Sequence, residues 1–225
     1  MSTERAFDGL HVVVTGGTGA LGRAVVDAFV AAGAICHVPH RGAAPADMKA
    51  SEQLRLVGGV ELSDEARVAR FYADLPGLWA SVHAAGGFAM APALATSLAD
   101  LRAQLDQNLV SAFLCSREAA RRMGAAGGRV VNVASRAGVD IDGGKLAYTI
   151  AKAGVVALTR ALAAELGPAV LVNAILPSTI DTAANRAAMP SADRSRWSQP
   201  ADIARAISWL SSPENANTTG ALVPV

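Results

Sequence analysis

Tyr148 and Lys152 stand four residues apart in a segment whose pattern is helical. Residues at this spacing project from the same face of an α-helix, so the phenol and the ammonium are expected to lie side by side. A free tyrosine titrates near pKa ~10, and a neighbouring ammonium favours the phenolate and lowers that pKa. Tyr148 is therefore predicted to exchange a proton with a bound molecule near neutral pH. Such pairs are also common on exposed helices, so the pair needs support from other residues.

Three further polar positions give that support. Ser135 stands thirteen residues before Tyr148, at the end of the apolar run VVNVAS, where its hydroxyl could orient a carbonyl group. Asn108 is a polar exception on the apolar face of the pattern LRAQLDQNLVSAFL. Pro177 follows the next apolar run. The ends of parallel strands meet at one edge of a sheet, so these residues are expected to gather around Tyr148.

A glycine-rich turn follows the first apolar run, VVV, and reads Thr15-Gly16-Gly17-Thr18-Gly19-Ala20-Leu21-Gly22 before a helical pattern begins. Glycines permit a tight turn and a close approach of backbone N–H groups to a pyrophosphate, and the positive end of the helix dipole favours that charge. Glycines also occur in turns for packing reasons. Because this turn lies between a strand and a helix at the start of the chain, it predicts a dinucleotide site.

The end of the second apolar run predicts which dinucleotide binds. An acidic residue there would accept the 2′-hydroxyl of NAD, whereas a cation suits the 2′-phosphate of NADP. The chain has Pro39-His40-Arg41 and no acid until Asp47. The Arg41 guanidinium can contact a phosphate with two N–H groups, which favours NADP(H) over NAD(H). The alternative is that Arg41 is a solvated loop residue.

The elements that must position these residues alternate along the chain. Apolar runs predict strands at 10–14, 34–38, 54–57, 79–84, 128–134, 170–175 and 221–225, and helical patterns cover 21–32, 63–75, 97–123, 147–166 and 200–210. Strands that are apolar on both faces and separated by helices indicate a parallel sheet covered on both sides. The fold class is therefore α/β, with residues 1–225 in a single-domain, Rossmann-type, doubly wound parallel sheet of about seven strands. Residues 178–199 are loop-like and are expected to form a flap over the substrate.

Composition excludes several classes of protein. Twenty Lys and Arg residues are scattered among nineteen Asp and Glu residues, which argues against a nucleic-acid partner. Cys36 and Cys115 lie in apolar runs and are expected to be reduced, and the polar N-terminal segment lacks a signal-peptide pattern, so a cytoplasmic location is expected. No uninterrupted apolar stretch of spanning length occurs, so no membrane partner is expected. His37 and His40 face opposite sides of a strand, and we expect no metal site.

The chain resembles the short-chain dehydrogenase/reductase family over nearly its whole length. The family's T-G-x-x-x-G-x-G pattern matches Thr15, Gly16 and Gly22, its N-A-G segment resembles 83–87, and its P-G-x-x-x-T pattern matches Pro177 and Thr182. Glu61-Leu62-Ser63 is similar to the D-[VL]-[ST] element that brackets adenine. The family's Asn–Ser–Tyr–Lys tetrad falls on Asn108, Ser135, Tyr148 and Lys152. The chain departs from the patterns at Ala20, Ala84 and Ser178 and in its C-terminal residues.

The resemblance implies an NAD(P)H-dependent oxidoreductase that moves a hydride between a nicotinamide and a carbonyl or alcohol. Tyr148 would transfer the proton with Ser135, Lys152 would lower the tyrosine pKa and bind the nicotinamide ribose, and Asn108 would hold a relay water. The expected cofactor-binding residues are Thr15, Gly16, Thr18, Gly19, Ala20, Leu21, Gly22, His40, Arg41, Glu61, Leu62, Ala84, Ala85, Gly86, Tyr148, Lys152, Pro177, Thr179, Ile180 and Thr182.

Two alternative functions remain open, and an oligomer is expected. Gly19-Ala20-Leu21-Gly22 and the stretch from Leu176 to Trp197 are similar to dihydropteridine reductases, which implies pterin reduction as one alternative. A sensor that binds NADP without turnover is the other. The helix at 147–166 is apolar nearly all round and must be covered on two faces, so we expect a homodimer or homotetramer through helices 97–123 and 147–166.

Overall fold

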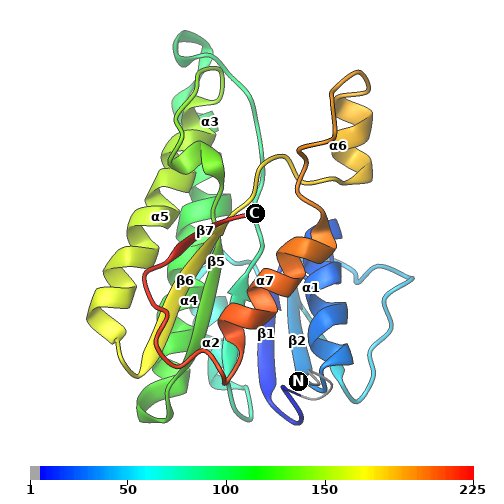
Figure 1. Cartoon of the computed structure of the whole chain (residues 1–225), viewed down its shortest axis with the longest axis vertical. Coiled ribbons are helices and arrows are strands. Elements are labelled where there is room, and N and C mark those ends of the chain that lie inside the picture. Colours follow the sequence, from blue (N-terminus) through cyan, green and yellow to red (C-terminus); the bar gives the residue numbers. More distant parts are fainter. Residues whose placement is uncertain (1–5) are drawn as a thin grey trace.

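Seven parallel strands pair in the order β3-β2-β1-β4-β5-β6-β7 in the computed structural model, which describes residues 6–225 (Figure 1). The chain runs outward from β1 to β3, returns to the middle, and continues from β4 to β7. The strands are β1 His11–Thr15, β2 Ile35–His40, β3 Leu54–Gly58, β4 Ala80–His83, β5 Gly128–Val133, β6 Val170–Leu176 and β7 Leu222–Pro224. The reversal between β1 and β4 opens a crevice at their carboxyl ends. The predicted doubly wound α/β sheet is confirmed.

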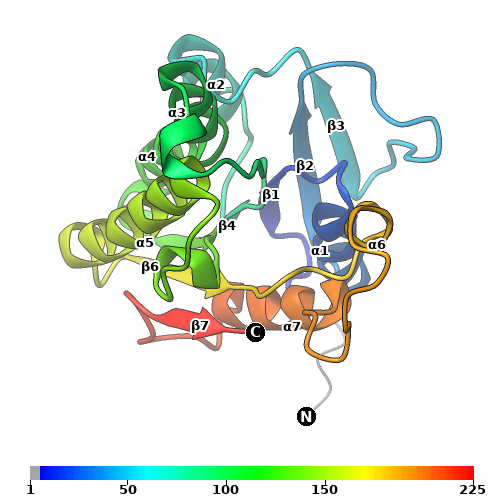
Figure 2. The ribbon, with the colours of Figure 1, turned by 90° about the horizontal axis from the view of Figure 1, so that it is seen from above.

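Helices cover both faces of the sheet because successive strand residues point to opposite sides. Val12 and Val14 pack with α1 and α7, whereas Val13 packs with α2 and α4. Figure 2 shows the two layers from above, with α3, α4 and α5 together and α1 and α7 apart from them. The helices are α1 Ala20–Ala31, α2 Glu65–Ala73, α3 Leu98–Gln104, α4 Ser111–Met123, α5 Leu146–Leu166, α6 Ala183–Ala188 and α7 Pro200–Ser211.

Two predicted segments differ from the structure. The helix expected at 97–123 is interrupted by a π-helical segment, η2 (Leu105–Val110), between α3 and α4. The loop expected at 178–199 contains the short helix α6, which begins where the Thr182 hydroxyl accepts a hydrogen bond from the Asn185 N–H. A side-chain cap satisfies one of the unpaired donors of a helix start, so even a short polar segment can form a turn of helix. Short 3-10 turns also occur at η1 (Ala93–Ala95), η3 (Gly124–Ala126) and η4 (Arg136–Gly138).

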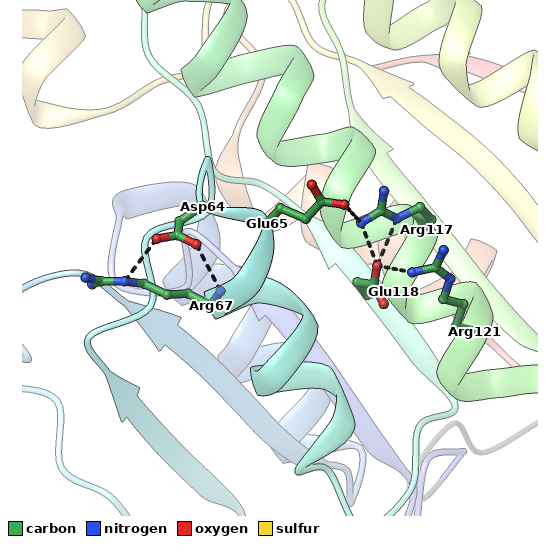
Figure 3. Close-up of polar contacts among 6 residues, drawn as sticks. All are labelled: Asp64, Glu65, Arg67, Arg117, Glu118 and Arg121. Carbon is green, nitrogen blue, oxygen red and sulfur yellow. Dashed lines mark hydrogen bonds and ion pairs between the residues drawn. The ribbon is translucent and has the colours of Figure 1, made fainter.

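A group of ion pairs joins α2 to α4 (Figure 3). Arg117 of α4 contacts Glu65 at 2.7 Å and its neighbour Glu118 at 2.8 Å, and Arg121 contacts Glu118 at 2.8 Å. The Glu118 side chain is only 8% exposed, so the two guanidinium groups offset the cost of removing its charge from water. The Arg117–Glu65 contact joins the two helices, and the contacts of Glu118 lie within α4.

Helix α5 has the length and the mean hydropathy, 1.3, that a membrane span would have. Lys152 and Arg160 interrupt its apolar residues, so it contains no uninterrupted apolar stretch of spanning length. In the fold, α5 packs against β6, η2 and η4. Of its apolar stretch 39% is buried in the fold, and core helices of globular domains can pass the same test of length and composition.

Candidate active site

Two glycines of the turn after β1 stand where the neighbouring backbone leaves no room for a side chain. Gly16 has a φ of +69°, and a Cβ atom there would lie 2.7 Å from the Ala85 nitrogen. A Cβ atom on Gly22 would collide with the backbone of Gly16 and Gly17. The Ala20 departure is accommodated because α1 begins at that residue, with Gly19 as its N-cap. The cradle therefore presents backbone atoms and a helix start at the crevice.

A cleft of about 530 Å³ opens along the carboxyl edge beside this cradle. It is lined by ten of the residues expected to bind a dinucleotide: Gly16, Thr18, Gly19, His40, Arg41, Glu61, Leu62, Ala84, Ala85 and Gly86. The cleft therefore runs from the glycine turn to the ends of β2, β3 and β4. A dinucleotide fits a crevice of this form at the point where the strand order reverses.

Other expected cofactor residues support the cleft without lining it. The Thr15 hydroxyl is buried and accepts a hydrogen bond from the Ala85 N–H at 3.3 Å. Leu21 is buried in the core with α1, and Gly22 packs on the turn. The Thr182 hydroxyl is engaged in capping α6. The cleft lining does not include Pro177, Thr179 or Ile180.

The rim of the cleft at β2 and β3 carries opposite charges. Arg41 Nη1 lies 3.6 Å from Glu61 Oε2, and the Arg41 side chain is 73% exposed. His40 Nδ1 lies 2.6 Å from the Gly42 carbonyl oxygen. The Arg41 guanidinium, which is expected to bind a phosphate, thus forms an ion pair with the Glu61 carboxylate. An exposed pair of this kind contributes little stability and can separate at low cost.

Tyr148 and Lys152 lie on the same face of α5, as the spacing predicts. Lys152 Nζ lies 5.8 Å from the centroid of the Tyr148 ring and donates a hydrogen bond of 2.8 Å to the Val133 carbonyl oxygen. Burial lowers the pKa of the Lys152 ammonium to about 8. Gly86 connects this pair to the cleft, because a Cβ atom there would lie 3.5 Å from Lys152 Nζ.

The expectation that the pKa of Tyr148 falls is wrong. Burial raises the pKa of its hydroxyl, and an interaction with the Ser135 side chain only partly offsets that shift. The reason is that burial of the phenol disfavours its charged form, while the lysine ammonium donates its hydrogen bond to Val133 and not to the phenol oxygen. Tyr148 is consequently protonated at neutral pH, the form that a proton donor requires.

Ser135 and Asn108 reach the same region from different elements. Ser135 follows β5 and caps η4, where its hydroxyl accepts a hydrogen bond from the Ala137 N–H at 3.2 Å. Asn108 is 1% exposed, and its amide donates 3.0 Å hydrogen bonds to the carbonyl oxygens of Gly87 and Gln104. The four predicted residues thus come from three places in the fold: Ser135 follows β5, Asn108 lies on η2, and Tyr148 and Lys152 lie on α5; Asn108 and Lys152 both lie against Gly86.

The π-helical segment adds residues that sequence reasoning missed. Asp106, Gln107 and Ser111, from η2 and the start of α4, line the cleft. Pro39, Val60, Ser63 and Ala103 complete the lining. No periodicity in the sequence distinguishes a π turn from the surrounding α-helix, so nothing indicated that these side chains face the site. A π segment of this kind is frequent at functional sites.

A chain of buried hydrogen bonds runs beneath the site. Asn132 Nδ2 donates to the Thr159 hydroxyl at 3.0 Å, so Asn132 Oδ1 must accept from His83 Nδ1 at 2.8 Å. The other imidazole nitrogen then accepts from Ser81 at 2.9 Å, and Ser81 accepts from the Tyr72 hydroxyl at 2.8 Å. Burial lowers the pKa of His83 to about 4, so the ring is neutral at neutral pH. The chain joins β4 to β5 and β5 to α5.

His37 does not pair with His40. Its Nε2 lies 2.8 Å from Nδ1 of His11 on the neighbouring strand, whereas His40 lines the cleft. Burial lowers the pKa of His37 to about 4, with a smaller effect from His11. The two histidines of β2 thus face different surroundings, as alternation along a strand requires.

The fold and this arrangement define a nucleotide-binding α/β protein with a tyrosine–lysine pair beside its cleft. A family model described as short chain dehydrogenase matches residues 10–193. The chain belongs to the short-chain dehydrogenase family, whose members are oxidoreductases that use nicotinamide cofactors.

Similar proteins cover the whole chain. Galactitol 2-dehydrogenase of Rhizobium johnstonii is 32% identical, with 100% of this chain and 97% of that protein covered. The cyclic-di-GMP-binding biofilm dispersal mediator protein of Escherichia coli (strain K12) is 29% identical over 96% of this chain and 95% of that protein. A solved structure of a short chain dehydrogenase/reductase family protein superposes with a TM-score of 0.89 and 29% identity, covering 98% of this chain and 97% of that one.

Proposed function

We propose that this protein is an NADP(H)-dependent reductase or dehydrogenase that interconverts a carbonyl compound and an alcohol. The observation that carries the proposal is the position of Lys152 Nζ, which lies beside Gly86 of the cleft and over the ring of Tyr148. A proton donor therefore stands next to a cleft that fits a dinucleotide. When bound, the nicotinamide supplies or takes the hydride at the carbonyl carbon.

Each residue of the tetrad has a separate role in this proposal. The Tyr148 hydroxyl gives its proton to the carbonyl oxygen as the C=O π electrons move onto that oxygen. The Ser135 hydroxyl holds the same oxygen in place. Lys152 provides a positive charge that offsets part of the cost of forming a phenolate in a buried position, and Asn108 fixes the turn at Gly87 and holds the water that returns a proton to Tyr148. In the reverse direction the same groups remove the alcohol proton.

Preference for NADP(H) over NAD(H) is supported by Arg41 at the end of β2. Its exposed guanidinium lines the cleft and can leave Glu61 for a 2′-phosphate, which is the stronger partner. An Arg41→Ala variant is expected to raise the KM for NADPH about tenfold and to leave the KM for NADH nearly unchanged. Equal effects on the two KM values would contradict this preference.

The deciding experiment is NADPH oxidation, followed by absorbance, against a panel of carbonyl compounds that includes quinonoid dihydropterin and β-ketoacyl thioesters. Tyr148→Phe should lower turnover by ~10²–10⁴-fold, because the acid is lost. Tyr72→Phe is the matched control, since it removes the chain's other phenolic hydroxyl, which is buried against Ser81. Near-normal turnover by Tyr148→Phe would refute the proposal, and turnover of the pterin alone would favour the pterin-reductase alternative.

The second candidate function is a non-catalytic NADP-binding sensor. The observation in its favour is the full-length similarity to a relative whose name describes cyclic-di-GMP binding and biofilm dispersal. NADPH binding by calorimetry without turnover of any carbonyl, unchanged in Tyr148→Phe, would favour the sensor over the enzyme.

The proposal also covers the domain organisation, the location and the assembly of the protein. Residues 1–225 would act as one catalytic domain in the cytoplasm, with residues 178–199 as the substrate flap. The exposed, small-residue face of α5 supports a homodimer or homotetramer through α4 and α5. Sedimentation analysis of the purified protein tests the assembly, and a monomer at micromolar concentration would contradict it.

A further inference from the structure

The segment that follows β4 is exposed and apolar without interruption. Every side chain from residue 88 to residue 95 is apolar, and all but Ala91 are exposed. The largest of them are among the most exposed hydrophobic side chains of the described residues: Phe88 at 59%, Met90 at 68% and Leu94 fully exposed. Contiguous exposed apolar residues mark a surface that binds something. We call residues 88–95 the apolar segment.

The apolar segment passes directly beside the proposed proton donor. The Phe88 ring meets the Tyr148 ring edge to face, with centroids 4.9 Å apart. Ala91 forms a β-bridge with Lys145, just before α5 begins. Met90 lies close to Gly144, because a Cβ atom there would be 3.7 Å from Met90 Cε. The segment therefore forms a wall next to the reacting atoms rather than a distant surface.

A second loop, which leads from Ser135 to the helix that carries Tyr148, also has exposed apolar side chains. Val139 is 47% exposed and Ile141 is 73% exposed in the loop that leads from Ser135 to α5. The charges of this loop are partly paired, since Lys145 Nζ lies 2.8 Å from Asp142. The loop also contains Arg136 and Asp140, so its two positive and two negative side chains leave it without a net charge.

The flap carries the same combination. Met189 is 38% exposed, whereas the Asp181 carboxylate is bound by Arg186 and by Gln199. The charges of Asp181 and Arg186 are thus paired, and the neutral Gln199 amide donates a further hydrogen bond to Asp181. A sugar or polyol would find few free hydrogen-bond partners on the apolar segment and would leave its own hydroxyl groups unpaired, which is costly.

We propose that the substrate is an uncharged ketone or aldehyde whose carbonyl carries an apolar group of several carbons, seated on the apolar segment and on Val139 and Ile141. This inference rests on the proposed reductase function. Each methylene that the segment covers fully should raise kcat/KM by up to about fourfold. Alkyl and aryl ketones should therefore be preferred over dihydroxyacetone and ketoses.

The test measures kcat/KM with NADPH for methyl ketones from 2-butanone to 2-decanone, with dihydroxyacetone as the polar member. In parallel, calorimetry measures binding of the same ketones to protein loaded with NADP⁺, which needs no turnover. The informative variant is Met90→Gln/Leu94→Gln, which removes apolar surface and spares Tyr148. Trp209→Gln is the matched control, because Trp209 is 55% exposed on α7, outside the loops around Tyr148.

The inference predicts that kcat/KM and affinity rise with chain length in the wild-type protein and in Trp209→Gln, and that the rise flattens in the double variant. Turnover that is flat with chain length, or higher for dihydroxyacetone, would overturn the inference and leave the reductase function standing. If no carbonyl turns over, the proposed function fails, and the inference about its substrate fails with it. If the dependence on ketone chain length is unchanged in the double variant and its mass in sedimentation is lower than that of the wild type, the apolar segment is an interface between copies. That result would overturn the inference.

Discussion

On the β1 side of the sheet the functional atoms belong to the backbone, whereas on the β4 and β5 side they are side chains held by other side chains. Gly16 and Gly22 shape the cradle because no Cβ atom fits at either position. Lys152 and Tyr148, by contrast, depend on α5, which the buried bonds of Asn132 and Thr159 fix to β5. The comparison teaches that a backbone requirement restricts a position to one residue type, while a side-chain network can be built from many types.

The largest expected effect on cofactor binding tests the backbone side. Gly22→Ala should weaken NADPH binding on the order of 100-fold, because the new Cβ atom must displace the backbone of Gly16 and overpacking costs ~1–3 kcal/mol. Gly19→Ala is the matched control, since its Cβ atom would lie 3.4 Å from the Gly16 oxygen, an ordinary contact. The measurement is the Kd for NADPH by fluorescence together with the Tm. Equal losses in the two variants would show that the turn is not specified by backbone contacts.

The side-chain half should respond to acid instead. The pKa of His83 is about 4 in the folded state and ~6.5 in the unfolded state. Between pH 6.5 and pH 4, His83 is therefore protonated in the unfolded state but not in the folded state, which favours unfolding. The free energy of unfolding should fall by at most about 3 kcal/mol over this window from this group. His83→Asn should flatten the loss in urea unfolding measured at pH 7 and pH 4.5. Ser81→Ala removes the hydrogen bond between Ser81 and His83 but keeps the imidazole, so this variant should retain the wild-type pH dependence. A flattened pH dependence in Ser81→Ala would contradict the assignment to His83.

A smaller pH effect is expected at the site itself. The pKa of Lys152 is about 8 because burial disfavours its ammonium form, so its charge disappears as the pH rises through 8. The rate constant kcat/KM for carbonyl reduction should then fall up to tenfold per pH unit above 8. Lys152→Arg keeps its charge, and its residual activity should show no such decline. A wild-type profile that stays level to pH 10 would remove the ammonium from the mechanism.

The smallest effect concerns the ring contact that joins the apolar segment to Tyr148. Edge-to-face aromatic pairs contribute ~0.5–1.5 kcal/mol beyond their buried area. Phe88→Leu should therefore change kcat/KM for an apolar ketone only several-fold, with Tyr148→Phe giving the far larger loss. A Phe88→Leu variant as inactive as Tyr148→Phe would mean that Phe88 positions the tyrosine. The side-chain half of the site would then restrict a position to one residue type, as the backbone half does.

Most of the sheet could be predicted from the sequence because parallel strands that are buried on both faces read as plain apolar runs. Val12, Val13 and Val14 illustrate this, since they serve two cores with one residue type. The glycine turn and the shared helix face of Tyr148 and Lys152 could also be predicted, because both are determined by local backbone geometry.

Other features depend on contacts between distant residues and had no local signature. The partners of His83 come from β5 and α4, and the pKa of Tyr148 is set by burial under loops that the sequence does not place. Helix α6 was missed because a single cap at Thr182 supports only six residues. The π segment was missed because its apolar spacing resembles that of an α-helix.

That π segment has a consequence for insertions and deletions. A π turn holds about one residue more than an α turn, so loss of one residue within 105–110 would let α3 and α4 join as a regular helix with both apolar faces still in place. The same deletion inside α4 would rotate every later residue by about 100° and turn Cys115 and Ala119 away from the sheet. The helix thus contains one site where chain length can change without loss of the fold, and that site carries Asn108.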